Sequence, residues 1–286
     1  TAPVSNLVRL AGTVTTGART AIQLALEERP DEPPTVRLSG TIAHGPHSFR
    51  EWIHLGQPTL AVAGAVASLL PHAGVTVTGR FRRGATAPTS VPLVERRSMP
   101  LSQILVPIMK HSSNFGAEMV LRALAAGDGE IPATTAGGAE RVLQCLDRWQ
   151  VPRAGVTLLD GSGFSRGDRV SARVLASVIL TARRGAPWGA DFMAGLPVAG
   201  EDGSLERRLR DLRGRVRAKT GTLDGVHALA GTIATPAGHE IVFAILLNRR
   251  RAGAELGHAS LDRIVRAIVA ASAGRPAPAS HPTKKM

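Results

Sequence analysis

The chain has 286 residues, of which 43% are hydrophobic and 3% aromatic, and its mean hydropathy is +0.04. This composition is typical of a globular protein, and the length allows about two domains with a sizeable core. The longest apolar run, residues 60–70, is far shorter than the roughly 20 residues of a membrane-spanning helix, so we expect no transmembrane segment. The single cysteine, Cys145, excludes an internal disulfide framework and a cysteine-based zinc cluster.

The chain carries a formal net charge of +13, which favours an anionic partner such as nucleic acid, a membrane surface or an acidic wall polymer. The basic residues are nearly all arginine, however, and an arginine-, alanine-, glycine- and proline-rich composition often reflects genome base composition. The sequence also lacks the aromatic stacking platforms of single-strand binders and any zinc-finger or helix-turn-helix signature. We therefore expect no nucleic-acid partner.

The first 95 residues are interpreted as a small mixed α/β module. Residues 6–14, 35–42 and 75–81 are rich in β-branched residues or alternate apolar with polar, which predicts strands. Residues 59–70 have the pattern of a helix, closed by proline and glycine. Glycine and prolines over residues 84–100 predict a linker.

The rest of the chain changes from helices to strands and back to a helix. Apolar periodicity predicts helices at 101–108, 115–126, 135–149, 171–184 and 256–271. Thr134 or Thr135, and Ser171, are the expected N-caps of the third and fourth of these helices.

Strand-like segments at 215–221, 226–234 and 240–247 separate the fourth helix from the last, and a hairpin turn joins the second and third strands. This order predicts an α+β fold, an antiparallel sheet with helices on its faces. We expect a catalytic-type domain at 96–271 and a disordered basic tail at 272–286.

Four polar clusters are candidates for chemistry. They are residues 111–114 (HSSN), 160–166 (DGSGFSR), 196–205 (LPVAGEDGSL) and 217–222 (RAKTGT). A Lys-Thr-Gly tripeptide or a Ser-x-Asn alone occurs by chance. Their order, their separation of about a hundred residues and their placement between helices and on a strand are together far more specific.

On these motifs the sequence resembles the D-alanyl-D-alanine carboxypeptidase/endopeptidases, the class C low-molecular-mass penicillin-binding proteins. The resemblance covers most of residues 96–270 and, more faintly, 1–95, and Ser113 stands where the family usually has aspartate. It implies the penicillin-binding-protein/serine β-lactamase-like transpeptidase fold, here incomplete, with residues 1–95 as the remnant of an inserted accessory domain and its linker.

The resemblance also implies roles for individual residues. Lys219 would supply positive potential for the terminal carboxylate of a D-Ala-D-Ala peptide, and the hydroxyls of Thr220 and Thr222 would hydrogen-bond the same carboxylate. Gly221 would let the substrate lie against the strand edge. The Thr222 N–H would be one oxyanion donor. Ser112 would relay a proton to the leaving amine, and Asn114 would donate its amide to a substrate carbonyl.

One element of the family pattern is absent. The nucleophile of the family lies in a Ser-x-x-Lys motif, and the only lysines here are Lys110, Lys219, Lys284 and Lys285, none with a serine three residues before it. Either the chain is a fragment or it has lost the catalytic serine, and we expect negligible turnover from the chain alone.

Simpler explanations exist for the same residues. Ser112 and Asn114 could cap a helix or form a turn, and Lys219 could be a strand-edge charge. Asp160-Gly-Ser-Gly is interpreted as a structural turn, and Cys145 as a small core residue.

The resulting prediction is a serine-type hydrolase of the cell envelope, periplasmic or extracytoplasmic, with no metal or organic cofactor. Its partners would be peptidoglycan stem peptides ending in D-Ala-D-Ala, and β-lactams, which mimic that end. The alternative is a non-catalytic pseudoenzyme that binds peptidoglycan or an anionic wall polymer through Lys219, Asn114 and an arginine-rich face.

Overall fold

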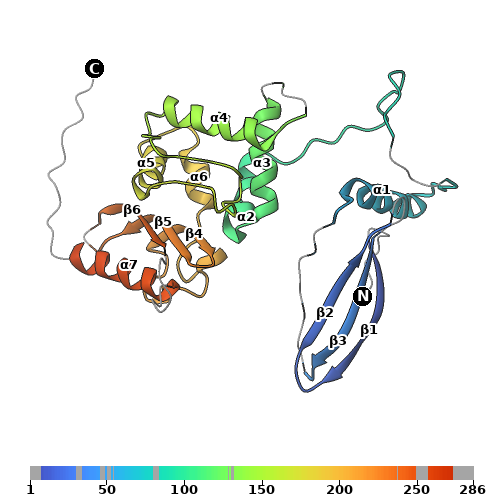
Figure 1. Ribbon diagram of the computed structural model, residues 1–286, viewed down its shortest axis with the longest axis horizontal. Coiled ribbons are helices and arrows are strands. Elements are labelled where there is room, and N and C mark those ends of the chain that lie inside the picture. Colours follow the sequence, from blue (N-terminus) through green and yellow to red (C-terminus); the bar gives the residue numbers. More distant parts are fainter. Residues whose placement is uncertain are drawn as a thin grey trace. The chain divides into compact units, whose positions relative to one another are not determined.

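A computed structural model describes residues 8–29, 34–45, 49, 53, 55–79, 84–127, 129, 132–236, 238–248 and 257–272 (Figure 1). The chain divides into two compact units, Thr1–Glu95 and Arg96–Met286. The predicted tail lies almost wholly outside the described residues. None of the described helices is long and apolar enough to cross a membrane.

The N-terminal unit contains a three-stranded sheet and a helix. Strand β3 (Thr35–Ala43) lies in the centre, parallel to β1 (Arg9–Gly17) and antiparallel to β2 (Ala21–Glu27). Helix α1 (Pro58–Leu69) and a 3₁₀ turn (Leu70–Ala73) follow. The strands and the helix expected near β1, β3 and α1 are confirmed within a few residues.

Two expectations for this unit need correction. Strand β2 was not predicted, because alanine, glutamine, leucine and glutamate favour a helix; the alternation of half-buried Ile22, Leu24 and Leu26 is satisfied only by pairing with β3. The strand predicted at 75–81 is wrong: residues 75–79 form no strand, and 80–83 lie outside the described residues. The Val75 N–H instead donates to the Leu70 carbonyl behind a left-handed Gly74 and closes the preceding turn.

The C-terminal unit has a helical part that matches the predicted helices. These are α2 (Leu101–His111), α3 (Asn114–Gly127), α4 (Thr135–Arg148) and α5 (Ala172–Arg183). Thr134 and Ser171 are the N-caps of α4 and α5, and each accepts a backbone N–H three residues on. The short α6 (Gly189–Gly195) was not predicted, because its two terminal glycines disfavour helix.

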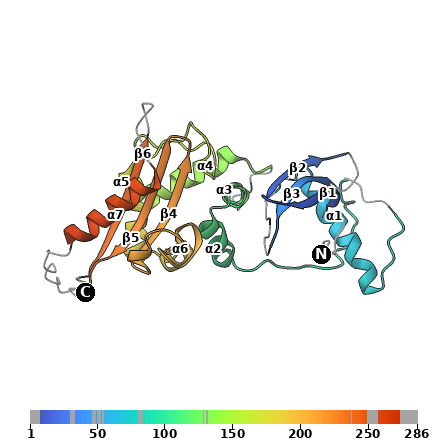
Figure 2. The same cartoon turned by 90° about the horizontal axis from the view of Figure 1, so that it is seen from below.

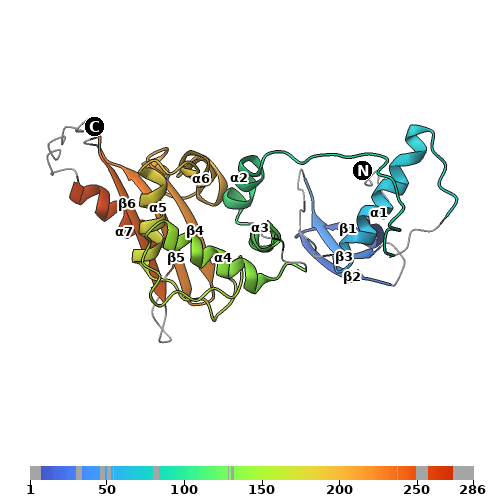
Figure 3. The same ribbon diagram turned by 90° about the horizontal axis from the view of Figure 1, so that it is seen from above.

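The sheet of this unit is antiparallel, in the order β4 (Val216–Leu223), β5 (Val226–Ala234), β6 (Glu240–Asn248). Helix α7 (His258–Ser272) covers one face and α5 the other (Figures 2 and 3). Leu261 and Val265 of α7 are fully buried against a core that includes Val216, Ala218 and Leu229. The predicted α+β architecture is confirmed, and it leaves β4 at the edge of the sheet.

The close approach of β4 and β5 depends on Gly231. A methyl group at this position would lie far inside van der Waals contact with the Arg217 carbonyl oxygen and with Ala218 of the neighbouring strand. The glycine therefore fixes the distance between β5 and the strand that carries Lys219.

We expect Gly231→Ala to lower the free energy of unfolding by about 3 kcal/mol or more, because the backbone of β4 must move to admit the methyl group. Gly127→Ala is the matched control: Gly127 ends α3 with open space around its Cα, and the change should be neutral or stabilising by about 0.5–1 kcal/mol. Urea denaturation of both variants measures the difference, and equal stabilities would contradict the expectation.

Candidate active site

The junction between α2 and α3 presents Ser112 to solvent. Ser112 ends α2 in the left-handed conformation, with φ 55° and ψ 52°. Ser113, not Ser112, caps α3: its Oγ accepts the Gly116 N–H at 3.1 Å, and its carbonyl accepts the Ala117 N–H at 3.0 Å. The alternative that Ser112 is the N-cap of the helix around Phe115 is therefore wrong; Ser112 is the backbone C-cap of α2, and its hydroxyl is available for another contact.

Lys219 supplies that contact from β4. Its Nζ donates to Ser112 Oγ at 2.7 Å and to the Thr220 carbonyl at 3.0 Å, across 107 residues of sequence from Ser112. Burial lowers the pKa of Lys219 from its ordinary value of 10.5, because a desolvated ammonium is less stable than a hydrated one. Lys219 is thus not the exposed edge charge of the simpler explanation, and it places a cation beside a hydroxyl.

The edge of β4 carries the other groups of the Lys-Thr-Gly-Thr segment. The Ala218 N–H donates outward to the Pro197 carbonyl, and the Val216 carbonyl accepts outward from the Ala199 N–H. Because backbone groups alternate along an antiparallel strand, those of Thr220 and Thr222 also point to the edge away from β5. The Thr222 N–H is therefore directed to the open side of the strand, as an oxyanion donor must be.

All six sequence-predicted site residues line one groove of about 370 Å³. Asn114 is the first residue of α3, next to the Ser112–Ser113 junction, and faces the same groove as β4. The lining residues from the predicted set are Ser112, Asn114, Lys219, Thr220, Gly221 and Thr222. The fold brings together residues more than a hundred positions apart, without showing what they bind.

The Asp160-Gly-Ser-Gly segment forms a wall of this groove. The Asp160 carboxylate accepts the N–H groups of Gly163 and Ser165, which closes the turn that the sequence predicted. Glu118 of α3 accepts the N–H groups of Gly161 and Ser162 at 2.8 and 3.2 Å. Glu118 thereby fixes the wall to the helix that begins at Asn114, a role that its spacing in the sequence did not reveal.

A second brace holds the end of α2. Lys110, whose side chain is 12% exposed, donates to the Leu196 carbonyl at 2.7 Å and to Asp202 Oδ2 at 2.6 Å. Asp202 Oδ1 in turn accepts the Val198 N–H at 2.8 Å. The 196–205 cluster therefore contributes by positioning the Ser112 junction, and the sequence analysis did not assign this bracing role to Lys110 or Asp202.

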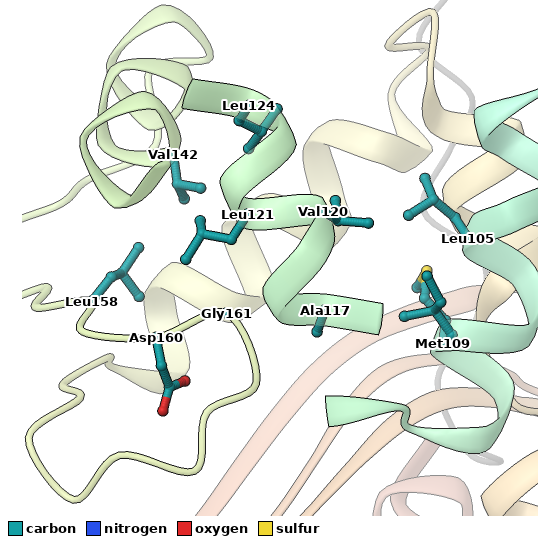
Figure 4. A pocket seen from close by; sticks show the side chains of 11 residues that line it. Leu105, Met109, Ala117, Val120, Leu121, Leu124, Val142, Leu158, Asp160 and Gly161 are labelled. Carbon is teal, nitrogen blue, oxygen red and sulfur yellow. The ribbon is translucent and has the colours of Figure 1, made fainter. Parts of the chain in front are cut away.

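An apolar cavity of about 320 Å³ adjoins the groove and shares Ile108, Met109, Ala117 and Gly161 with it (Figure 4). Leucine and valine side chains from α2, α3, α4 and the 158–161 loop converge on it; those labelled in the figure are Leu105, Val120, Leu121, Leu124, Val142 and Leu158. The groove that holds the six predicted site residues is thus continuous with an apolar surface.

The buried ammonium of Lys219 predicts a dependence of stability on pH. Because its pKa is lowered on folding, the unfolded chain binds the proton more tightly, so the free energy of unfolding should rise as pH increases from the lowered value towards 10.5. We expect Lys219→Met to remove this rise. It should also raise the Tm at pH 7 by about 2–4 °C, the equivalent of about 1 kcal/mol, since no charge is then buried. Calorimetry between pH 7 and 10.5 tests this, and an unchanged pH profile in the variant would contradict it.

Comparison with known proteins finds one matching family and several similar relatives. The model of the D-Ala-D-Ala carboxypeptidase 3 (S13) family matches residues 2–269. The D-alanyl-D-alanine carboxypeptidase of Actinomadura sp. (strain R39) is 34% identical over 246 residues, 82% of this chain and 45% of that protein. Carboxypeptidase DacB of Mycolicibacterium smegmatis is 32% identical over 200 residues, 67% of this chain and 42% of that protein.

Solved structures share the fold. The crystal structure of penicillin binding protein 4 (DacB) from Haemophilus influenzae in complex with a β-lactam matches with a TM-score of 0.70 at 23% identity, and covers 94% of this chain and 64% of its own. A predatory peptidoglycan endopeptidase from Bdellovibrio bacteriovorus matches with a TM-score of 0.50 at 18% identity, over 80% of this chain and 59% of its own. The chain spans about half the length of the curated relatives it matches.

Proposed function

Because this chain belongs to the D-Ala-D-Ala carboxypeptidase 3 (S13) family, we propose that it supplies the carboxylate clamp of a serine-type carboxypeptidase/endopeptidase. The substrate would be a peptidoglycan stem peptide that ends in D-Ala-D-Ala, and β-lactams would occupy the same groove. The observation that carries the proposal is the Lys219 Nζ to Ser112 Oγ contact of 2.7 Å at a groove lined by the Lys-Thr-Gly-Thr edge. A cation and a hydroxyl in contact are the groups that acyl transfer to and from a peptide needs.

Each residue would have a separate task in that reaction. Lys219 holds positive charge near the terminal carboxylate, and the hydroxyls of Thr220 and Thr222 donate to it. The Thr222 N–H, on the open edge of β4, stabilises the negative oxygen of the tetrahedral intermediate. Ser112, in contact with Lys219, passes a proton to the leaving amine, and Asn114 donates to a substrate carbonyl.

The attacking serine of a Ser-x-x-Lys motif is not among the 286 residues. The proposal therefore gives this chain substrate binding and one oxyanion donor, and assigns the attacking serine to none of its 286 residues. The family's action on peptidoglycan supports a location in the cell envelope for the working protein.

Intact-mass spectrometry after incubation with a penicillin tests the division of tasks. We expect no acyl adduct on this chain, and a stoichiometric adduct once an upstream segment carrying Ser-x-x-Lys is restored from the coding sequence. An adduct on the chain alone would show that one of its own serines is the nucleophile, with Ser112 and Ser162 the first to be mapped. An unacylated restored protein would instead favour a pseudoenzyme.

Binding measurements separate the peptide clamp from the alternative, a non-catalytic wall-polymer binder. We expect an N-acylated peptide ending in D-Ala-D-Ala to bind about tenfold or more weakly to Lys219→Ala than to the unchanged chain, because a charge-assisted hydrogen bond is lost. Arg207→Ala serves as a control for total charge. Binding of an anionic wall polymer that falls steeply with salt and is unaffected by Lys219→Ala would support the alternative.

A further inference from the structure

The hydroxyl of Thr222 has a hydrogen-bond partner on α7, the helix on the sheet face opposite α5. The His258 Nε2 lies 2.9 Å from Thr222 Oγ1, although the two residues are 36 positions apart. His258 is the first residue of α7, which lies on the sheet face shown in Figure 2 and is anchored there by the fully buried Leu261 and Val265. The position of the imidazole relative to β4 is therefore set by the core.

The direction of this hydrogen bond decides what Thr222 can offer to the groove. A threonine hydroxyl has one proton and two acceptor sites. If Thr222 donates to Nε2, its hydroxyl can only accept and will not bind an anion. If His258 carries the proton on Nε2 and donates, the Thr222 proton stays available for a ligand carboxylate.

The groups around His258 come from three elements. His227 of β5 packs edge-to-face on the ring, with centroids 5.3 Å apart. Arg208, from the segment between α6 and β4, forms an ion pair of 2.6 Å with Asp262, one turn further along α7. Burial, then Arg208 and His227, lower the pKa of His258, while Asp262 opposes them. His258 is thus largely neutral at pH 7, where the tautomer and not the charge determines which partner donates.

We propose that His258 is a positioning residue for substrate recognition, which donates from Nε2 to Thr222 Oγ1 and so directs the Thr222 hydroxyl proton to the C-terminal carboxylate of the bound peptide. This inference rests on the proposed function and adds a residue that acts on the substrate only through Thr222. Thr220, the other threonine of the segment, has a similar polar partner: Ser204 Oγ lies 2.7 Å from Thr220 Oγ1.

A linkage between ligand and proton follows. Protonated His258 always carries a hydrogen on Nε2, so protonation and carboxylate binding favour the same arrangement. A bound carboxylate should therefore raise the pKa of His258, and lower pH should strengthen binding of the carboxylate. A ligand that ends in a carboxamide gives no such coupling through charge.

The test is an NMR titration of the His258 ring between pH 5.5 and 8, with N-acyl-D-Ala-D-Ala peptides ending in a carboxylate or a carboxamide. We expect the pKa of His258 to rise only with the carboxylate peptide, and we expect no rise in Thr222→Val.

His258→Leu should bind the carboxylate peptide about three- to tenfold more weakly, the effect of one hydrogen bond. His258→Gln, whose side-chain amide can still donate, should restore most of that affinity while losing the pH dependence that His258 provides. Any pH dependence that persists in His258→Gln comes from a group other than His258.

The outcomes separate the two proposals. A carboxylate peptide that binds without changing the pKa of His258, or that binds His258→Leu as tightly as the unchanged chain, overturns the inference and leaves the proposed function standing. Absence of binding to the unchanged chain overturns the proposed function and the inference with it. Circular dichroism of each variant shows whether it is folded. If His258→Leu is misfolded, the affinity of His258→Gln for the carboxylate peptide decides whether the inference holds.

Discussion

The contact between Lys219 and Ser112 is the constraint on which the rest of the site depends. It joins a sheet edge to a helix junction across 107 residues of sequence, and it holds only if both supports are rigid to within a fraction of an ångström. The sheet side is set by the core under α7 and by the glycine that lets β5 approach β4. The helix side is set by Lys110 and Asp202, which tie the end of α2 to the 196–205 segment.

Several of these features lower the stability of the fold but hold the side chains of the site in place. Ser112 adopts a left-handed backbone without being glycine, and Lys219 keeps an ammonium in a desolvated position that lowers its pKa. Strain and buried charge of this kind gather at binding and catalytic sites, because the surrounding structure holds the groups in place. The same arrangement leaves Thr220 and Thr222 backed by polar partners, Ser204 and His258, rather than by apolar packing.

Most regular elements of the C-terminal unit could be predicted from periodicity and capping, because Thr134, Ser171 and the apolar faces act over a few residues. Strand β2 and the strand expected at 75–81 show the limit of that approach. Both have alternating patterns, but β2 pairs with β3, whereas the described part of the second segment, residues 75–79, forms no strand. The six predicted site residues were found through motifs and resemblance. The supporting roles of Glu118, Lys110, Asp202 and His258 were not, because each depends on a contact that spans at least 36 positions.

The sequence by itself determined the class of the fold, the family pattern around Ser112, Asn114 and Lys219, and the absence of a Ser-x-x-Lys motif from these residues. These are properties of residue order and local spacing. Only the tertiary structure decided that Ser113 caps α3 and leaves Ser112 for Lys219, that the Thr222 N–H points to the open edge of β4, and that His258 lies behind Thr222. Those facts depend on strand register and on how α7 packs over the sheet, and long-range packing of this kind has no signature in local sequence.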